Sequence, residues 1–414
     1  MRTFDAIVLG GGLTGLSVAL HLQARGWLCL VLDRAGPGEE ASRANAGILG
    51  CDAFLRPDLP LTTGEVLLRL VRPGGATRID PRALASLIPF LKVAGAFDAP
   101  RAVSGAARAL APLQAAAIGE HLALARAASA LRFFRRTGWV KLYRRPASFQ
   151  ASEQDRHFAR IFGVSYAVLS DDDLREMEPD LAWPDLAAIS WPDSQSVSSP
   201  GGVAKAYARL FRERGGAVET GNAATLVRIR SGWAVRGARG EARAPVVVAA
   251  LGAATPDILR SLGVSLPVAG LRGYHRHFRA VHGVRLSRPV TDVDGGFTLT
   301  PMDRGVRLVG GHELTHADAP PRDTALERAE RAARALFPLG ARVEETPIPA
   351  VRAFLPDGLP VIGAVPDLPG LWLAVPHARD GFALAPALGR LLAETMAGER
   401  PFADPAPFAP TRFL

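Results

Sequence analysis

The feature that most constrains this chain is the run Gly10-Gly11-Gly12-Leu13-Thr14-Gly15, which matches the pattern GxGxxG. An apolar segment, residues 4–9, precedes it, and residues 16–26 follow with apolar side chains at helical spacing. In a strand–turn–helix unit the first glycine permits a tight turn, the second lets the backbone approach a diphosphate, and the third lets helix and strand pack closely. The sequence therefore predicts a nucleotide-binding βαβ unit near residue 10.

An acidic residue stands where such a unit needs one. A second apolar strand, residues 27–32, stops at Asp33, where a carboxylate can accept hydrogen bonds from ribose hydroxyls, and Arg34 follows it. The amino end of the intervening helix directs N–H groups and the positive end of its dipole at the phosphates. The predicted nucleotide contacts in this unit are Gly10, Gly12, Leu13, Thr14, Gly15, Asp33 and Arg34.

A run of mostly small residues, Ala41-Ser42-Arg43-Ala44-Asn45-Ala46-Gly47-Ile48-Leu49-Gly50, lies just past this carboxylate. A backbone with few large side chains can lie close to an extended ligand, such as the ribityl chain and ring of FAD. We therefore favour FAD over NAD. The predicted contacts in this run are Ser42, Arg43, Asn45, Ala46, Gly47 and Ile48.

From this run onward the sequence resembles the D-amino-acid oxidase superfamily, most of all its bacterial D-amino-acid dehydrogenases and glycine oxidases. Residues 42–47 resemble the segment (S)-x-A-(N/A)-A-G of these proteins, and Arg272-Gly273-Tyr274 is similar to (K/R)-G-Y. Residues 352–363 look like R-P-x-x-P-D-G-x-P-x-I-G. Residues 377–387 closely resemble H-x-R-N-G-x-x-L-A-P-A, so the resemblance runs along the whole chain.

The resemblance implies a function and further site residues. It implies hydride transfer from the α-carbon of an amino acid or related amine to FAD, giving an imino acid and then a 2-oxo acid. Arg352 and Arg379 would hold the substrate carboxylate, for which a guanidinium is suited because it makes two parallel charge-assisted bonds. Strand alternation adds Tyr274 as a pocket residue. The further FAD contacts that the resemblance implies are Ala224, Gly252, Asp380, Gly381, Phe382 and Ala383.

The chain departs from its relatives around one of these arginines. Ile348 stands where relatives often have Trp, and Ala350 and Ala353 replace the Gly and Pro that flank the arginine. These changes reshape the expected pocket wall. Other functions also stay open, because a carboxylate clamp serves a hydroxy acid as well and the basic charge permits contact with RNA. Two alternatives are a 2-hydroxy acid dehydrogenase and a flavoprotein that acts on an RNA-borne amino-acid group. A flavin-binding protein without turnover is a third.

The predicted architecture is an α/β chain of two discontinuous domains. Residues 1–55, 196–262 and 353–414 are expected to form a Rossmann-like FAD-binding domain. Residues 56–195 and 263–352 are expected to form an α+β substrate domain built on an antiparallel sheet, because residues 266–315 alternate in polarity.

Composition narrows the expected partners. The net charge of +9 comes almost entirely from arginine, but no lysine/arginine block marks a nucleic-acid tail, so we expect no nucleic-acid partner. The two cysteines, Cys29 and Cys51, support neither a disulfide framework nor a metal site, which favours a reducing, cytoplasmic location. Relatives with covalent flavin carry a cysteine late in the chain, so FAD is expected to be noncovalent here. We expect no membrane span; residues 84–97 are apolar enough to contact the inner face of a membrane, although a core helix is favoured. Oxygen, a quinone or another carrier would reoxidise the flavin.

Overall fold

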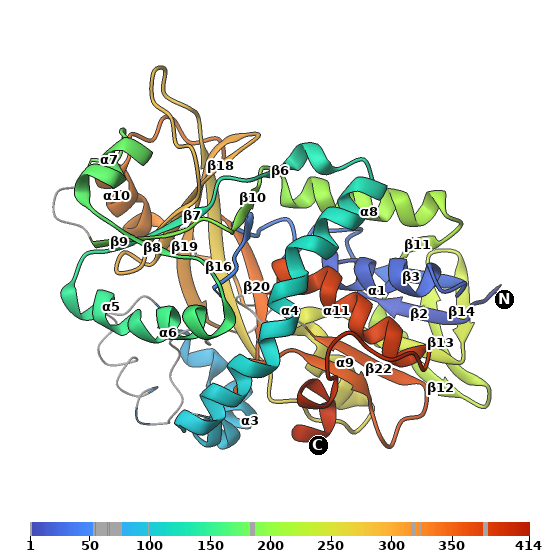
Figure 1. Ribbon diagram of the computed structural model, residues 1–414. Helices are drawn as coiled ribbons and strands as arrows, with labels where there is room; N and C mark the ends of the chain where they lie inside the picture. Colours follow the sequence, from blue (N-terminus) through green and yellow to red (C-terminus); the bar gives the residue numbers. More distant parts are fainter. Residues whose placement is uncertain are drawn as a thin grey trace.

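The computed structural model describes residues 2–52, 54, 64, 66, 77–97, 99–182, 187–315, 319–322, 324–375 and 380–414. Two large sheets lie side by side, each with helices packed against it (Figure 1). The mixed α/β architecture with a Rossmann-like unit and a largely antiparallel second sheet confirms the predicted fold class.

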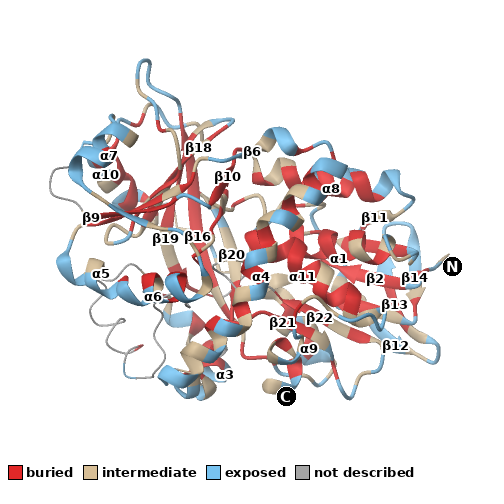
Figure 2. Ribbon diagram, viewed as in Figure 1, coloured by how far each residue is buried: buried red, intermediate tan, exposed pale blue. Residues whose placement is uncertain are grey.

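The first sheet has six strands in the order β11-β3-β2-β15-β22-β21. The first five strands are parallel, and β21 runs antiparallel to β22. These strands are β2 (Ala6–Leu9), β3 (Cys29–Asp33), β11 (Ala217–Thr220), β15 (Val246–Ala249), β21 (Val361–Ala364) and β22 (Leu371–Val375). The four central strands, β3, β2, β15 and β22, are mostly buried, as strands covered on both faces are, whereas the edge strands β11 and β21 are partly exposed (Figure 2). Three separate stretches of sequence therefore build one sheet.

Helices cover one face of this sheet, and a small sheet covers the other. The helices are α1 (Leu13–Gln23), α8 (Pro200–Glu213) and α11 (Gly381–Met396), with α4 (Pro100–Ala127) packed on α11. The small sheet consists of β1 (Arg2–Thr3), β12 (Val227–Ile229), β13 (Gly232–Gly237) and β14 (Gly240–Ala244), and α9 (Thr255–Ser261) packs beside it. The helix expected over residues 16–26 begins earlier, at Leu13, because the last residues of the glycine motif already form its first turn.

The second sheet has nine strands, eight of them in the order β20-β16-β19-β18-β17-β7-β9-β8, with β5 paired to β19. Among the strand pairs that the described residues form in this sheet, β17–β7 and β19–β5 are parallel and the others are antiparallel. The strands are β5 (Thr77–Ile79), β7 (Trp139–Tyr143), β8 (Ala167–Leu169), β9 (Ala187–Trp191), β16 (Ala269–Phe278), β17 (Val290–Asp292), β18 (Phe297–Met302), β19 (Gly305–Leu314) and β20 (Ile348–Phe354).

The remaining elements surround these layers. Helix α10 (Glu327–Leu336) covers one face of the second sheet. The others are α3 (Leu84–Ala94), α5 (Pro146–Ala151), α6 (Glu153–Phe162), α7 (Asp171–Met177), β4 (Ile48–Leu49), β6 (Phe134–Arg135) and β10 (Gln195–Val197). In the described part of the chain, none of the helices combines the length and apolar character that crossing a bilayer requires.

Strand β16 divides its side chains between the two faces of the second sheet, and this division positions the site. Tyr274 and Arg276 point toward α10, where Arg276 pairs with Glu330 at 2.6 Å. His275 and His277 point to the opposite face. On that face Arg307, the cross-strand partner of His277, contacts the backbone of the glycine-rich segment near residue 45, so this face looks toward the first unit.

Candidate active site

A cleft of about 580 Å³ opens at the carboxyl ends of β2, β3 and β15. Ligands bind at this edge of open parallel sheets. Its lining includes nine of the residues predicted to contact the cofactor: Gly10, Gly12, Leu13, Thr14, Asp33, Arg34, Ser42, Ala224 and Gly252.

The glycines of the motif divide between packing and access. A Cβ on Gly15 would lie 1.9 Å from the carbonyl oxygen of Gly10, and a Cβ on Gly10 would lie 2.4 Å from that of Ala250. The packing of the backbone therefore requires glycine at both positions, whether or not a nucleotide is bound. A Cβ on Gly12 would meet only the Ser42 hydroxyl, at 3.5 Å. Gly12 therefore leaves open space on the cleft side, where a diphosphate needs to approach the backbone.

The amino end of α1 is suited to bind an anion. Gly12 caps the helix without a side chain, and the first turn carries no acidic residue. The N–H of Leu13 donates to the Ser42 hydroxyl at 2.9 Å. Asp33 fixes the turn around this end, since its carboxylate accepts from the N–H groups of Gly11 at 2.6 Å and Gly36 at 2.9 Å. Beside it, Arg34 pairs with Glu40.

The rest of the predicted cofactor segment is held by the second sheet. The guanidinium of Arg307 donates to the main-chain oxygens of Arg43 at 3.0 Å and Asn45 at 2.6 Å. Its Nε atom donates to Nε2 of His277 at 3.0 Å, and the other ring nitrogen of His277 contacts Glu344 at 3.0 Å. Burial lowers the pKa of His277 to about 4, so the neutral ring can accept from Arg307 and donate to Glu344. Ala46, Gly47 and Ile48 continue this segment, and Ile48 pairs with Ser196 on β10.

The last predicted cofactor residues form the start of α11. Asp380 precedes the helix, and Gly381, Phe382 and Ala383 are its first three residues. Arg379 and His377 lie outside the described residues.

Arg352 lies on β20 with its guanidinium over Gly273 of β16, and within the described part of the chain it forms no hydrogen bond or ion pair. A Cβ on Gly273 would lie 2.9 Å from Nη2 of Arg352 and 3.4 Å from Cδ2 of His312. Burial lowers the pKa of Arg352, and no charged neighbour among the described residues offsets that effect. Arg352 is thus a half-buried guanidinium with no acidic partner among the described residues.

Tyr274 lies on the opposite face of the sheet from Arg352, and its role as a pocket residue stays a prediction. It is 1% exposed on the α10 face, where its hydroxyl donates to Glu313 at 2.5 Å and accepts from the N–H of Arg322 at 3.0 Å. Its place in the register, opposite Pro349, puts it across the sheet from Arg352. This position supports a structural role.

Sequence reasoning missed His312 and Arg307. His312 lies beside Arg352, and Arg307 anchors the cofactor segment, but both are single polar residues in a strand. Nothing in their local sequence distinguishes them from surface residues.

Comparison with known proteins now decides the family. A family model described as DAO, FAD dependent oxidoreductase, matches residues 5–395. The chain belongs to the DAO family of FAD-dependent oxidoreductases. FAD is therefore its cofactor, as the sequence predicted.

Individual relatives agree with this family. A D-amino acid dehydrogenase of Methylobacterium nodulans is 30% identical over 95% of this chain and 96% of its own length. A glycine oxidase of Pseudomonas aeruginosa is 36% identical over 42% of this chain and 47% of its own. The crystal structure of glycine oxidase from Geobacillus kaustophilus matches with a TM-score of 0.77 and 22% identity, covering 100% of this chain and 99% of that one.

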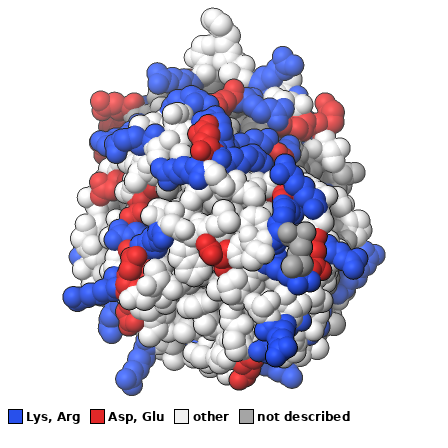
Figure 3. All heavy atoms as spheres, turned by 90° about the vertical axis from the view of Figure 1, so that its right-hand side faces the viewer, with Lys and Arg blue, Asp and Glu red and all other residues white. Residues whose placement is uncertain are grey.

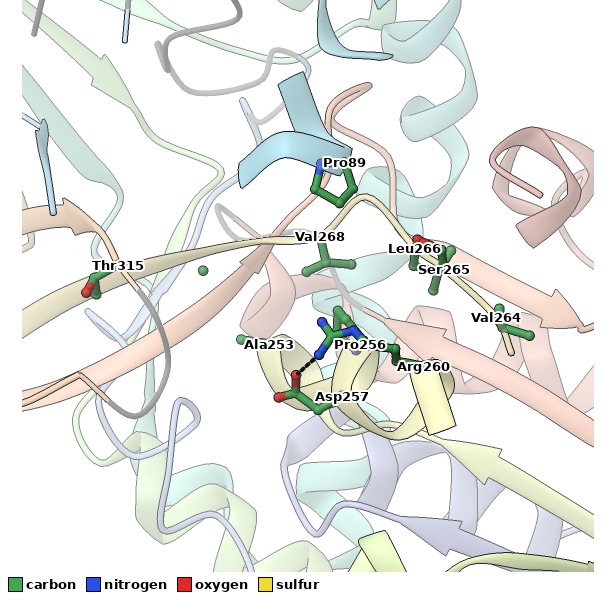
Figure 4. Close-up of a pocket in the computed structure, with 11 residues that line it drawn as sticks. Pro89, Ala253, Pro256, Asp257, Arg260, Val264, Ser265, Leu266, Val268 and Thr315 are labelled. Atoms are coloured by element: carbon green, nitrogen blue, oxygen red, sulfur yellow. Dashed lines mark ion pairs between the residues drawn. The ribbon is translucent and has the colours of Figure 1, made fainter. Parts of the chain in front are cut away.

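The residues of this DAO-family chain fit FAD at the large cleft. The open space at Gly12, the α1 amino end without a side-chain cap and the carboxylate of Asp33 meet there. A smaller cleft of about 90 Å³ adjoins it, between α9, Pro89 of α3 and the start of β16 (Figure 4). Asp257 and Arg260 face each other there at 3.5 Å. That space is too small for a dinucleotide.

Several charged side chains at the surface of the first unit pair with a neighbour of opposite charge. On the side formed by the first unit, basic side chains are widespread with acidic ones among them (Figure 3). On α8, for example, Lys205 pairs with Glu39 at 2.7 Å and Arg209 with Glu213 at 3.4 Å. Within the described ranges, no group of three His, Cys, Asp or Glu side chains could hold a metal ion.

Proposed function

We propose that this chain oxidises an amino acid or N-alkyl amino acid at its α-carbon, giving an imino acid that hydrolyses to a 2-oxo acid. The observation that carries the proposal is the guanidinium of Arg352, desolvated and without a carboxylate partner among the described residues. A partly buried charge that lacks a partner is costly, and a substrate carboxylate would relieve that cost. Arg379, by its resemblance to the family, is the second proposed carboxylate ligand.

The lining of the large cleft suggests which residues would hold each part of FAD. Gly10, Gly12, Leu13, Thr14 and Ser42 would hold the diphosphate of a noncovalent FAD, with Asp33 on a ribose. The first turn of α11, residues 380–383, and residues 43–48 would contact the remainder. FAD supplies the acceptor for a hydride when it is bound. The chain supplies the grip on the carboxylate, which fixes the α-carbon and lowers the entropic cost of reaction.

The named relatives act on amino acids, so they do not favour the two alternatives, a 2-hydroxy acid dehydrogenase and an RNA-modifying flavoprotein. We place the protein in the cytoplasm, in contact with the inner face of a membrane if a quinone accepts its electrons.

An anaerobic panel tests this proposal. Purified protein is mixed with D-amino acids, L-amino acids, glycine, N-alkyl amino acids and 2-hydroxy acids, and bleaching of the flavin is recorded. We expect at least one amino acid to bleach it and the 2-hydroxy acids to leave it oxidised. Bleaching by 2-hydroxy acids alone contradicts the proposal. Air is then admitted to identify the electron acceptor. If oxygen is the acceptor, the flavin colour returns at once; if a quinone or another carrier is, it does not.

A further inference from the structure

A β-bulge in β19 turns His312 toward Arg352. Between Gly310 and Glu313 strand β19 advances three residues while β16 advances two, from Tyr274 to Arg272. Gly311 provides the extra residue at a φ of 64°, a conformation that suits glycine. Glu313 therefore returns to the α10 face, and its neighbour His312 points to the face that carries Arg352. Without the bulge His312 would point the other way.

His312 and Arg352 converge over Gly273. Both side chains come within 3.4 Å of the same point, the position of a Cβ on that glycine. Nη2 of Arg352 and Cδ2 of His312 are thus no more than about 6 Å apart. β16, which carries Gly273, lies between β19 and β20 in the sheet, so the missing side chain is what lets the two meet.

The imidazole of His312 has hydrogen-bonding capacity that the described residues leave unused. Within the described residues, no hydrogen bond or ion pair holds either ring nitrogen of His312. Burial, and to a lesser degree the charge of Arg352, lowers its pKa to about 3. The ring is therefore neutral near pH 7, with one N–H to donate and no capacity to serve there as a strong base. Both ring nitrogens of His275 are fully buried and lack a hydrogen-bond partner in the part of the chain that the structure describes. The ring nitrogens of His312 are not among such fully buried atoms.

We propose that His312 determines substrate specificity by donating its N–H to one oxygen of the carboxylate that Arg352 binds. This inference rests on the proposed function. One carboxylate would satisfy both neighbouring groups, because its two oxygens offer lone pairs to a guanidinium and to a further donor. Amides and esters, which lack the anionic oxygen pair, would lose this contact.

The test uses benzoate, a carboxylate that cannot be oxidised, and benzamide, its neutral counterpart. Binding to the FAD-loaded protein is followed by the change in the flavin spectrum. His312→Leu removes the donor, His312→Gln retains an N–H, and His282→Leu removes an exposed histidine as control.

We expect His312→Leu to raise the Kd of benzoate at least about tenfold, since a hydrogen bond to a charged group is lost. His312→Gln should recover most of the affinity, and benzamide binding should not change. An unchanged benzoate Kd in a flavin-loaded His312→Leu protein overturns the inference, as does a wild-type protein that binds no benzoate. A wild-type protein that binds benzoate but is reduced by no amine contradicts the proposed function instead.

A second measurement does not depend on the folding of the leucine variant. In protein with ¹⁵N-labelled histidine, the His312 signals are assigned by their loss in His312→Gln. Benzoate should shift them, and unshifted signals under saturating benzoate overturn the inference.

Discussion

Nε2 of His121, on α4, lies 2.8 Å from the main-chain oxygen of Phe382 in the first turn of α11. In a regular helix that oxygen accepts from the N–H four residues later, but residue 386 is a proline and has none. A carbonyl only accepts, so Nε2 carries the proton. The imidazole of His121 thus replaces the missing helical bond at the helix end proposed to face the flavin, and it stacks on the Phe382 ring at 5.4 Å.

Replacing His121 should weaken this end of α11. His121→Leu leaves the Phe382 oxygen buried and unsatisfied, which costs about 1–3 kcal/mol. We expect a lower melting temperature, with His121→Gln less affected because its amide can donate. Equal losses in both variants, measured by thermal unfolding, would show that the ring's volume matters and its hydrogen bond does not.

Two glycines of the motif should respond differently to alanine. Gly15→Ala places a methyl 1.9 Å from a carbonyl, so it should destabilise the protein even without flavin. Gly12→Ala meets nothing closer than 3.5 Å, so the flavin-free protein should melt as wild type does. Its Kd for FAD should nevertheless rise by about tenfold or more, or about 1.4 kcal/mol. If Gly12→Ala binds FAD as tightly as the wild type does, the diphosphate does not lie against Gly12.

Gly273→Ala should move the Arg352 guanidinium without unfolding the sheet. The nearest atom, at 2.9 Å, is the end of a flexible side chain, which can shift at small cost. We expect full flavin content and a KM for amino acid raised several-fold, about 1 kcal/mol of binding. Gly119→Ala on α4, where a Cβ meets nothing within 4 Å, is the matched control. A KM equal to that of the control would contradict the placement of Arg352.

Stability should fall in mild acid. Burial lowers the pKa of His121 to about 4 and of His275 to about 2, below the ordinary value of 6.5. Between 6.5 and these values the unfolded chain binds protons that the native protein does not. Each ring therefore lowers the free energy of unfolding by about 1.4 kcal/mol per pH unit through that window. Melting temperatures at about pH 7, 6 and 5 should decline, and less steeply in His121→Gln; parallel declines would exclude His121 as a source.

The parts of this site that the sequence predicted are those set by neighbours along the chain. The glycine spacing and Asp33 act within one βαβ unit, so their pattern indicates both the turn and the cleft. The domain boundaries stay a prediction. Alternation correctly separated Tyr274 from the histidines of β16. It did not show that both faces approach the first unit: Arg272, on the Tyr274 face, lines the cleft, and Arg307, on the histidine face, holds residues 43–45. The bulge at Gly311 that redirects His312 had no local signal, and His121 supports a helix 261 residues away.

The rate of flavin reduction, measured by rapid mixing against amino-acid concentration, tests the account most directly. In Arg352→Met the concentration for half-saturation should rise by about thirtyfold or more, because a buried charge pair contributes about 2–5 kcal/mol. Arg260→Met, which removes an exposed arginine, should match the wild type. If Arg352→Met and the wild type, both with flavin fully bound, need the same amino-acid concentration for half-saturation, the claim that Arg352 holds the substrate is contradicted.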